Sequence, residues 1–359
     1  MNKKKILFLS PYPFGKAPSQ RLKFEQYYPY FEEAGFELET SSFIDEAFWK
    51  VIYQPGNLAG KISGTLRGYL RRFLDVLRLH QYDIVYIHLW VTPLGPPFFE
   101  WLIKKLAKKI VYDIDDMIYL NNSSARFIDK IKGRNKPIAL MKSADAVIVC
   151  SPFLQKFVQQ YNQNVTTILA TYNTETTQPK QHHSKEVTTI GWTGTHSTMK
   201  YLSIVEDALT ELSKIRKIEF LVICNAPYQH SGFPVRNITW TAANEIADLK
   251  QIDIGLYPLE KEEWVLGKSG NKALAYMNVG IPCIATDFGT NSLVINEGTD
   301  GFLVDNTKEA WLKSLLYLTD NPEERARIGK NARQAVEDKF SVNANKNAYL
   351  SVLKGLLLN

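Results

Sequence analysis

Residues 264–289 read WVLGKSGNKALAYMNVGIPCIATDFG and hold a glycine-bearing turn with two lysines, Lys268 and Lys272. The spacing predicts a helix over 272–279, ended by Gly280 as a left-handed cap, and then a buried strand. The free N–H groups of the helix N-terminus and the two ammonium groups would face one space, which suits a diphosphate. The alternative is an ordinary loop–helix–strand unit whose lysines are solvated.

Two further turns follow predicted strands of the same half. Gly289, Thr290 and Asn291 come after the apolar run 281–286 and offer more backbone N–H donors. Gly194 comes after the strand predicted near 188–191, where a residue without Cβ lets the backbone approach a ligand. Ser197 is expected to cap a helix over residues 198–212.

Residues 268–289 resemble the nucleotide-sugar segment of family four glycosyltransferases, usually written Lys-x-x-x-Lys-x-Leu-Glu-Tyr-Met-x-x-Gly-x-Pro-Val-Ile-Ala. Residues 191–202 resemble the Gly-Trp-x-Gly-x-x-Ser-x-x-x-Tyr-Leu segment of the same group, whose expected role is to approach the donor's diphosphate. The resemblance implies an α/β GT-B fold, with two Rossmann-like domains facing a central cleft. Three positions depart from the family: Gly267, Ala275 and Leu293 stand where relatives carry acidic residues that hold the donor.

The patterns and the resemblance together predict a donor site in the C-terminal half. Its residues are Gly194, Thr195, Ser197, Trp264, Lys268, Lys272, Ala275, Gly289, Thr290 and Asn291. Trp264 is assigned there because relatives place this stretch toward the nucleotide, and base stacking on an aromatic ring is reasonable. The alternative for Trp264 is an anchor in the core.

In the N-terminal half, residues 110–116 predict a strand that runs into three carboxylates, Asp113, Asp115 and Asp116. Aspartate is unfavourable inside a strand, so the cluster needs a cause. One cause is metal–diphosphate coordination of the DxD kind, and the other is binding of the acceptor. Relatives carry a similar Tyr-Asp-x-Asp-Asp run, which favours the acceptor. The resemblance makes Asp115 catalytic and Asp113 and Asp116 acceptor-binding.

Three more polar residues belong to the same expected site. His88 ends a predicted strand and is a second catalytic candidate, with a structural hydrogen-bonding role as the alternative. Ser19 and Arg21 follow the loop after the first strand, and the resemblance assigns them to the acceptor. The alternative for Arg21 is a surface arginine at a helix start.

Residues 62–79 predict an amphipathic basic helix, with apolar residues at helical spacing among lysines and arginines. The interpretation we favour buries its apolar side against the sheet and leaves the arginines solvated. The alternative places the helix on an anionic leaflet, where it presents a lipid-linked acceptor.

Composition limits the protein class. The chain has 359 residues, 45% of them hydrophobic, and a net charge of +6, which favours anionic ligands without the clustering of a nucleic-acid binder. Three cysteines in apolar runs predict buried free thiols and a reducing cytosol. No run is long enough for a membrane span or a signal peptide. We expect a cytoplasmic protein, with peripheral contact at the inner face of the cell membrane.

The predicted organisation has four parts. These are an acceptor domain (1–170), a linker (171–187), a nucleotide-sugar domain (188–340) and a final helix (341–359) that crosses back to the first domain. His182 and His183 in the linker are read as solvated.

The resemblance implies a retaining, metal-independent glycosyltransferase with a nucleotide-diphosphate sugar as co-substrate and no cofactor. The acceptor would be a glycan or a lipid-linked molecule in polysaccharide, lipopolysaccharide or glycoconjugate synthesis. The alternatives are a weakly catalytic sugar-nucleotide binding protein and an epimerase or hydrolase of the same fold.

Overall fold

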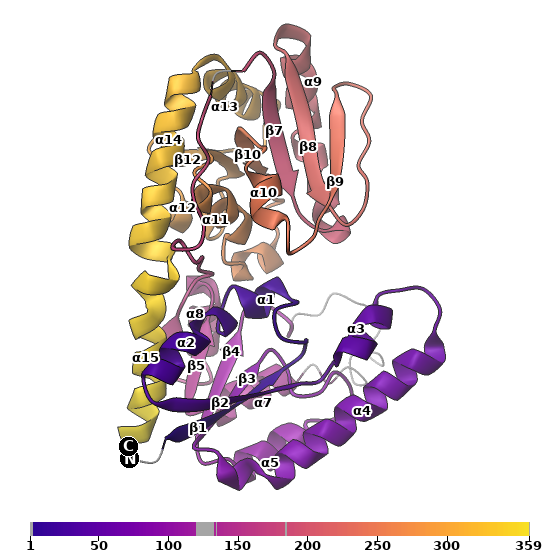
Figure 1. The fold of residues 1–359 in the computed structure, drawn as a ribbon, viewed down its shortest axis with the longest axis vertical. Coiled ribbons are helices and arrows are strands. Elements are labelled where there is room, and N and C mark those ends of the chain that lie inside the picture. Colours follow the sequence, from indigo (N-terminus) through magenta and orange to yellow (C-terminus); the bar gives the residue numbers. More distant parts are fainter. Residues whose placement is uncertain (1–2, 120–132, 134, 184, 359) are drawn as a thin grey trace. The chain divides into compact units, whose positions relative to one another are not determined.

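The computed structural model describes residues 3–119, 133, 135–183 and 185–358. The chain forms two compact units, one made of Met1–Leu169 with Asn345–Asn359 and the other of Ala170–Ala344. Each unit is built on a six-stranded sheet covered by helices (Figure 1).

The sheet of unit 1 has the order β2-β1-β3-β4-β5-β6, with every neighbouring pair parallel. Its strands are β1 (Lys4–Ser10), β2 (Phe36–Ser42), β3 (Ile84–His88), β4 (Ile110–Ile114), β5 (Ala146–Val149) and β6 (Val165–Thr167). The strand order reverses between β1 and β3. Ligands of open parallel sheets bind beyond the carboxyl ends of strands at such a switch point.

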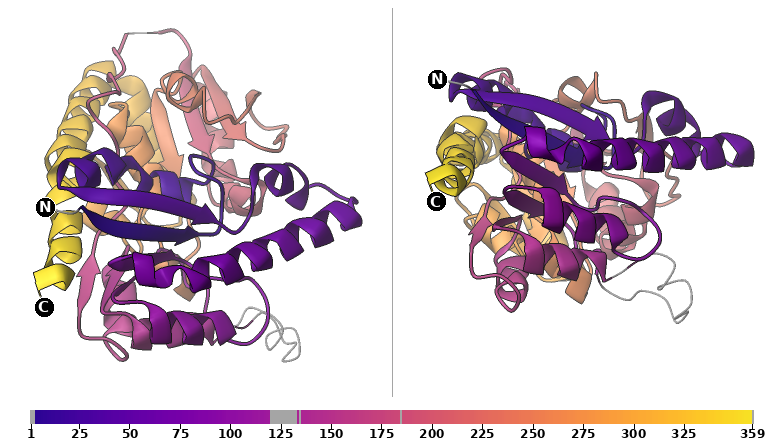
Figure 2. Two further views of the ribbon diagram at one scale, coloured as in Figure 1. Left: turned by 60° about the horizontal axis from the view of Figure 1, so that its bottom comes forward. Right: turned by 90° about the horizontal axis from the view of Figure 1, so that it is seen from below.

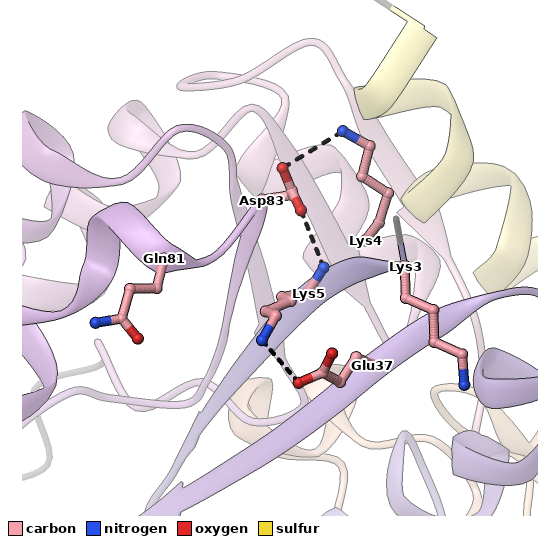
Figure 3. Close-up of a pocket in the computed structure, with 6 residues that line it drawn as sticks. All are labelled: Lys3, Lys4, Lys5, Glu37, Gln81 and Asp83. Atoms are coloured by element: carbon pink, nitrogen blue, oxygen red, sulfur yellow. Dashed lines mark hydrogen bonds and ion pairs between the residues drawn. The ribbon is translucent and has the colours of Figure 1, made fainter. Parts of the chain in front are cut away.

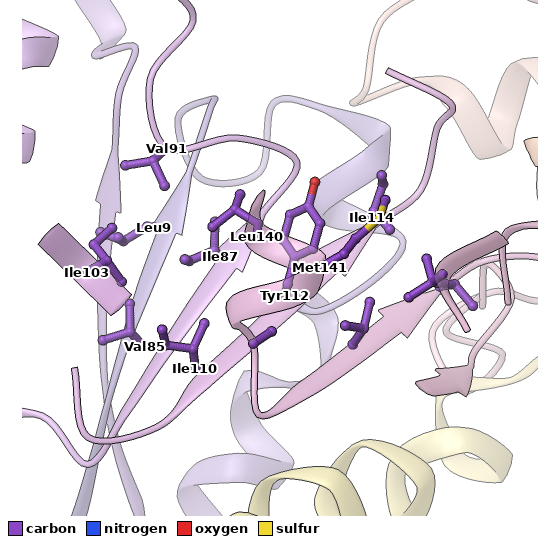
Figure 4. Packing of buried hydrophobic residues seen from close by; sticks show 14 of the residues in the cluster. Leu9, Val85, Ile87, Val91, Ile103, Ile110, Tyr112, Ile114, Leu140 and Met141 are labelled. Carbon is purple, nitrogen blue, oxygen red and sulfur yellow. The ribbon is translucent and has the colours of Figure 1, made fainter. Parts of the chain in front are cut away.

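Short helices connect these strands. They are α1 (Pro18–Arg21), η1 (Glu25–Tyr27), α2 (Tyr28–Glu33), α3 (Glu46–Ile52), α4 (Leu58–Leu77), η2 (Leu79–Gln81), α5 (Phe98–Leu106), α7 (Lys136–Ser143) and α8 (Pro152–Val158). Buried side chains of β1, β3 and β4 meet those of α5 and α7 in one core (Figure 4). Near-continuous apolar runs are expected for parallel strands that are covered on both faces.

Unit 2 repeats this plan with the order β12-β11-β10-β7-β8-β9, again all parallel. Its strands are β7 (Thr188–Thr193), β8 (Ile218–Cys224), β9 (Val235–Thr239), β10 (Ile254–Tyr257), β11 (Cys283–Thr286) and β12 (Gly301–Val304). The switch point lies between β7 and β10.

The helices of unit 2 include the segment expected after the lysine turn. They are η3 (His196–Ile204), α9 (Glu206–Ile215), α10 (Glu245–Leu249), η4 (Glu263–Gly267), α11 (Asn271–Asn278), α12 (Asn291–Val294), α13 (Lys308–Asp320), α14 (Pro322–Ala335) and η5 (Val336–Phe340). The last helix, α15 (Val342–Leu358), runs into unit 1, where the Tyr349 ring lies 4.4 Å from that of Tyr27.

The three cysteines are free and buried, as the sequence predicts. The segment 171–187, expected as a linker, belongs to unit 2. The solvated interpretation of His182 is wrong, because its Nε2 lies 2.7 Å from the carbonyl oxygen of Gly280. Among the described helices, none has both the length and the apolarity needed to cross a bilayer.

The favoured interpretation of the basic helix is also wrong. The predicted inner residues, such as Leu66 and Leu70 of α4, are 64% and 59% exposed, while Arg72 is 1% exposed. The side of α4 that faces the protein carries Gly64 and Gly68, and a Cβ on either glycine would overlap a phenylalanine ring. The helix therefore packs through its small residues and presents its leucines to solvent.

Candidate functional site

In unit 2 the predicted donor residues all follow strands that end at one edge of the sheet. Gly194, Thr195 and Ser197 follow β7, the lysine turn follows β10, and residues 289–291 follow β11. Because β7, β10 and β11 are neighbours in a parallel sheet, these three loops meet at the carboxyl edge beside the switch point. This edge is our candidate donor site.

Lys272 is the second residue of α11, and its ammonium group lies against aromatic rings. Its Nζ is 4.4 Å from the centre of the Trp192 ring and 5.7 Å from that of Tyr257. It donates a 3.1 Å hydrogen bond to Thr198 Oγ1. Cation–π contacts and one hydroxyl compensate an ammonium group only in part.

Burial lowers the pKa of Lys272 to about 7, and repulsion from Lys268 adds to this effect. Within the described residues no carboxylate forms an ion pair with Lys272. A buried lysine is usually paired with a carboxylate, because an uncompensated buried charge is energetically costly. Lys272 is thus a buried amine whose positive charge is only partly compensated within the described chain.

Lys268 stands on the face of Trp264, with its Nζ 4.0 Å from the ring centre. The indole Nε1 of Trp264 donates to Glu262, and the Tyr201 ring is stacked 6.4 Å away. The ring face of Trp264, which is predicted to stack on a base, is therefore in contact with Lys268 and orients that lysine.

Gly194 has a steric role at this edge. A Cβ built on it would lie 2.3 Å from the Trp192 ring and 2.7 Å from Lys272 Nζ. Any side chain at this position would displace the tryptophan and the lysine that rests on it.

The cap of the following helix differs from the prediction. Thr195, not Ser197, is the N-cap of η3 and forms a capping box with Thr198. Thr195 is the N-cap because it is the last residue with an extended backbone before the helical turn, which is where an N-cap residue lies. The hydroxyl oxygens of Thr195 and Ser197 lie 2.9 Å apart, and both residues are exposed.

The turn after β11 is hydrogen-bonded to the lysine turn. Thr290 Oγ1 donates a 2.7 Å hydrogen bond to the carbonyl of Lys268, and Asn291 Nδ2 donates a 2.9 Å bond to that of Thr286. Both residues are buried, so their side chains serve the loop itself. Gly289 has a φ of +65°, which allows the tight turn.

The three family departures occupy different environments. Ala275 is 5% exposed within α11, Gly267 is buried at the end of η4, and Leu293 is 52% exposed on α12. A carboxylate at Ala275 would be largely buried, whereas one at Leu293 would be solvated.

In unit 1, His88 and Asp113 are register partners at the carboxyl ends of β3 and β4. His88 Nδ1 lies 3.0 Å from Asp113 Oδ2, and Lys23 Nζ pairs with Asp113 Oδ1. All three side chains are buried, and His88 Nε2 has no hydrogen-bond partner within the described chain. Asp115 Oδ1 is 4.0 Å from that nitrogen.

The charges of this cluster are set by its geometry. Burial raises the pKa of Asp113, but Lys23 and His88 outweigh it, so that the pKa is lowered overall. Burial raises the pKa of Asp115 and is only partly offset by His88 and Lys23. The contact with Asp113 fixes the orientation of the His88 ring through Nδ1, so that Nε2 faces Asp115.

The structure corrects the assignment of Asp113 to acceptor contact, because its side chain is 0% exposed and both oxygens are engaged. Asp115, with 15% of its side chain exposed, is more accessible than Asp113. Asp116 Oδ1 accepts a 2.7 Å bond from the Met117 N–H, so at least one of its oxygens caps the chain locally.

Ser19 and Arg21 lie on α1, directly after the loop that follows β1. The sequence interpretation missed the residues that hold this loop. Gln20 binds both the N–H and the carbonyl of Tyr12, and Glu25 accepts from Gln20 and from the Gly15 N–H. Lys23 was missed as well, although three clustered aspartates already implied a nearby cation.

A polar pocket at the opposite edge of unit 1 is not part of this site (Figure 3). It is lined by Lys3, Lys4, Lys5, Glu37, Gln81 and Asp83. Lys4 and Lys5 are paired with Asp83 and Glu37 there, at the amino ends of β1 and β2. Within the described residues, no group of three or more His, Cys, Asp or Glu side chains is arranged to hold a metal ion.

Comparison with known proteins agrees with this architecture. Residues 238–335, which include the lysine turn, match the family model "Glycosyl transferases group 1". The sequence matches none of the curated proteins.

Solved structures show the same fold at low identity. A glycosyltransferase from Rickettsia africae is 16% identical with a TM-score of 0.72, and all of both chains is covered. Sucrose-phosphate synthase from Thermosynechococcus elongatus is 14% identical with a TM-score of 0.70, over 99% of this chain and 100% of the other. HepE of Anabaena, solved with UDP and glucose, is 15% identical with a TM-score of 0.68, over 98% and 100%. The chain has the GT-B fold, as predicted, and its lysine turn lies in a segment similar to group 1 glycosyl transferases.

Proposed function

We propose that the chain is a glycosyltransferase of the family four type. It would transfer a sugar from a nucleoside-diphosphate donor, bound by unit 2, to a hydroxyl of a glycan or lipid-linked acceptor, as a step in glycoconjugate synthesis. One observation carries the proposal: Lys272 is a desolvated ammonium group at the ligand edge of unit 2, without a carboxylate in the described chain to pair with it. The family match over the same segment supports it.

A diphosphate would supply the negative charge and the hydrogen-bond acceptors that this edge lacks. Two lysines, Lys268 and Lys272, flank the start of α11, whose N-cap Gly270 provides no side-chain cap. A phosphate oxygen would accept from the first N–H groups of the helix and from Lys272 at once. The same groups would stabilise the charge that grows on the diphosphate as the sugar leaves.

The proposed reaction needs no divalent ion, because the lysines and the helix end neutralise the leaving diphosphate. Retention at the anomeric carbon is part of the proposal, with the leaving phosphate as the base for the incoming hydroxyl. Turnover in the presence of a chelator tests the metal-independent part. Unchanged turnover is expected, and loss of turnover with rescue by manganese would favour a metal-dependent mechanism.

The cluster of unit 1 is proposed to receive the acceptor. Asp113 and Lys23 are positioning residues that fix the orientation of the His88 ring and present its unpartnered Nε2. An acceptor hydroxyl bound between Nε2 and Asp115 would satisfy that nitrogen. Asp115, whose pKa is raised by burial, would hold a proton up to a higher pH than an ordinary aspartate does.

Uridine nucleotides are the first donors to test, since HepE was solved with UDP. Radiolabelled UDP-sugars are incubated with and without lipid and glycan acceptors, and the label is followed. Label in an acceptor-dependent product is expected. Donor consumption without acceptor would indicate a hydrolase or an epimerase.

A weakly catalytic sugar-nucleotide binding protein is the second candidate. It is favoured by Ala275 and Leu293, which replace two carboxylates that relatives use to hold the donor. Donor binding without consumption in the same experiment would support this candidate.

A further inference from the structure

The outward side of α4 is an uninterrupted apolar stripe. Seven large apolar side chains at three- and four-residue spacing are each about half exposed or more: Leu58, Ile62, Leu66, Leu70, Phe73, Leu74 and Leu77. Side chains at this spacing share one helix face. Helix α4 has twenty residues, which makes it about 30 Å long, and it lies along one edge of unit 1 (Figures 1 and 2).

The inward side of α4 fixes this orientation. The Arg72 guanidinium is buried and donates to the backbone carbonyls of Ser10, Ser41 and Val91 and to the Asp75 carboxylate. Rotating the helix to bury its leucines would break these bonds and leave a buried charge unpaired, which is strongly unfavourable. The exposed stripe is therefore a stable feature of the fold.

The neighbouring segment extends the same kind of surface. Helix α5 packs against α4, and Tyr69 of α4 donates a 2.7 Å bond to the carbonyl of Leu94. Leu94, Phe98, Trp101 and Leu106 are 42% to 54% exposed. Together α4 and residues 94–106 hold eleven of the eighteen exposed large apolar side chains in the described residues, so the apolar surface is concentrated here. We call it the α4/α5 face.

The segments that form the α4/α5 face are rich in basic residues. Residues 58–78 contain five Lys or Arg and one Asp, and residues 98–109 contain four Lys and one Glu. Both carboxylates of these segments, Asp75 and Glu100, are buried, and so is Arg72. Carboxylates of neighbouring elements pair with Arg67, Arg71, Arg78, Lys108 and Lys109. On α5, the positive charge that stays unpaired within the described residues is therefore that of Lys104 and Lys105. Lys104 and Lys105 are exposed on α5, directly beside Leu106.

We propose that the α4/α5 face docks on an anionic lipid bilayer, with the leucine stripe and Trp101 entering the headgroup boundary and the lysines contacting lipid phosphates. A helix with one apolar side, a basic remainder and an aromatic anchor suits this interface. A second copy of the chain fits less well, because a two-fold contact would bring the same positive charges together. The proposal does not depend on the transferase reaction.

Vesicle co-sedimentation tests it without reference to activity. The purified protein is mixed with vesicles of phosphatidylcholine and phosphatidylglycerol in equal parts, or with phosphatidylcholine alone. Binding to the anionic vesicles is expected, weakening with salt. The double variant Leu66→Glu, Leu70→Glu should lose roughly tenfold or more in partitioning, because two apolar side chains no longer enter the lipid.

Two further variants keep the test specific. Ile215→Glu makes the same kind of change at an equally exposed position of unit 2 and should bind as the unaltered protein does. Lys104→Gln with Lys105→Gln should weaken binding to anionic vesicles by roughly fivefold for each lysine.

Three results would overturn the proposal. They are an unaltered protein that binds neither vesicle, a leucine variant that binds as well as the unaltered protein, and a lipid-free dimer that the leucine variant dissociates while vesicle binding is absent. The last result would make the α4/α5 face an interface between copies.

Discussion

Replacing Lys272 with methionine removes one of the two lysine charges of the proposed diphosphate site and keeps an unbranched apolar stem between Trp192 and Tyr257. The lysine contributes one charge-assisted contact, worth about 1.5–3 kcal/mol. We therefore expect donor affinity at neutral pH to fall by roughly tenfold to a hundredfold.

The pH dependence of binding provides a sharper test. The pKa of Lys272 is lowered to about 7 by burial, and a bound diphosphate would raise it toward the ordinary 10.5. Above pH 7 the free protein must then take up a proton to bind, so the association constant should fall by up to about tenfold per pH unit. Below pH 7 the lysine is already charged and the affinity should level off.

The pKa of Lys272 also differs between the folded and the unfolded chain, and this difference predicts how the stability of the free protein changes with pH. The unfolded chain holds the Lys272 proton up to about pH 10.5, whereas the folded chain releases it near 7. Stability should therefore rise with pH across this interval. At and below pH 7 the full cost is present, with an upper bound of about 5 kcal/mol. Lys272→Met should melt at a higher temperature than the unaltered protein at neutral pH.

Calorimetry with a UDP-sugar, from about pH 6 to about pH 9, measures both the affinity and the proton uptake. The sugar diphosphate does not itself titrate in this range. The reasoning is refuted if Lys272→Met keeps the pH slope of the unaltered protein, or if its affinity is unchanged throughout.

The remaining predictions concern other residues of the two sites. Lys268→Ala should weaken donor binding by about 1.5–3 kcal/mol and, because its repulsion no longer lowers the pKa of Lys272, should move the start of the pH slope to higher pH; equal affinity in the titration would count against its diphosphate contact. Asp113→Asn should leave donor affinity unchanged while it lowers turnover and, because Lys23 loses its buried partner, stability by about 3–5 kcal/mol in thermal unfolding. Ala275→Glu should lower the melting temperature, since a buried carboxylate without a positioned donor costs about 1–3 kcal/mol; a gain in donor affinity in the same variant would show that the site has kept the family's shape.

The strands were predictable because buried parallel strands are continuous apolar runs. The apolar run 6–10 predicts a strand and lies in β1, and the run before Asp113 lies in β4. The helical pattern of residues 20–34 predicts a single helix, which is wrong, since the structure has the short helices α1, η1 and α2 there. Pro29 lies in the first turn of α2, where its missing N–H is harmless, and it ends any helix that would run through it.

The side that a helix buries was harder to predict than the helix itself. In α4 the leucine pattern favoured a buried apolar side, but Gly64 and Gly68 mark the side that approaches Phe48 and Phe43. Small residues at four-residue spacing allow close packing and carry no hydropathy signal. The burial of Arg72 was equally hard to predict, because its partners are backbone carbonyls that no sequence pattern reveals.

The candidate donor residues were found because glycines and lysines follow strand ends. Their partners were not, since Trp192, Tyr257 and Thr198 meet Lys272 only through the order of the strands in the sheet. The switch between β7 and β10 is a property of topology.

A crystal structure of the protein with bound UDP tests the central claim most directly. The account predicts diphosphate oxygens within hydrogen-bonding distance of Lys272 Nζ and of the first N–H groups of α11. A diphosphate bound away from this edge, with Lys272 still held by Thr198 and the two aromatic rings alone, would contradict it.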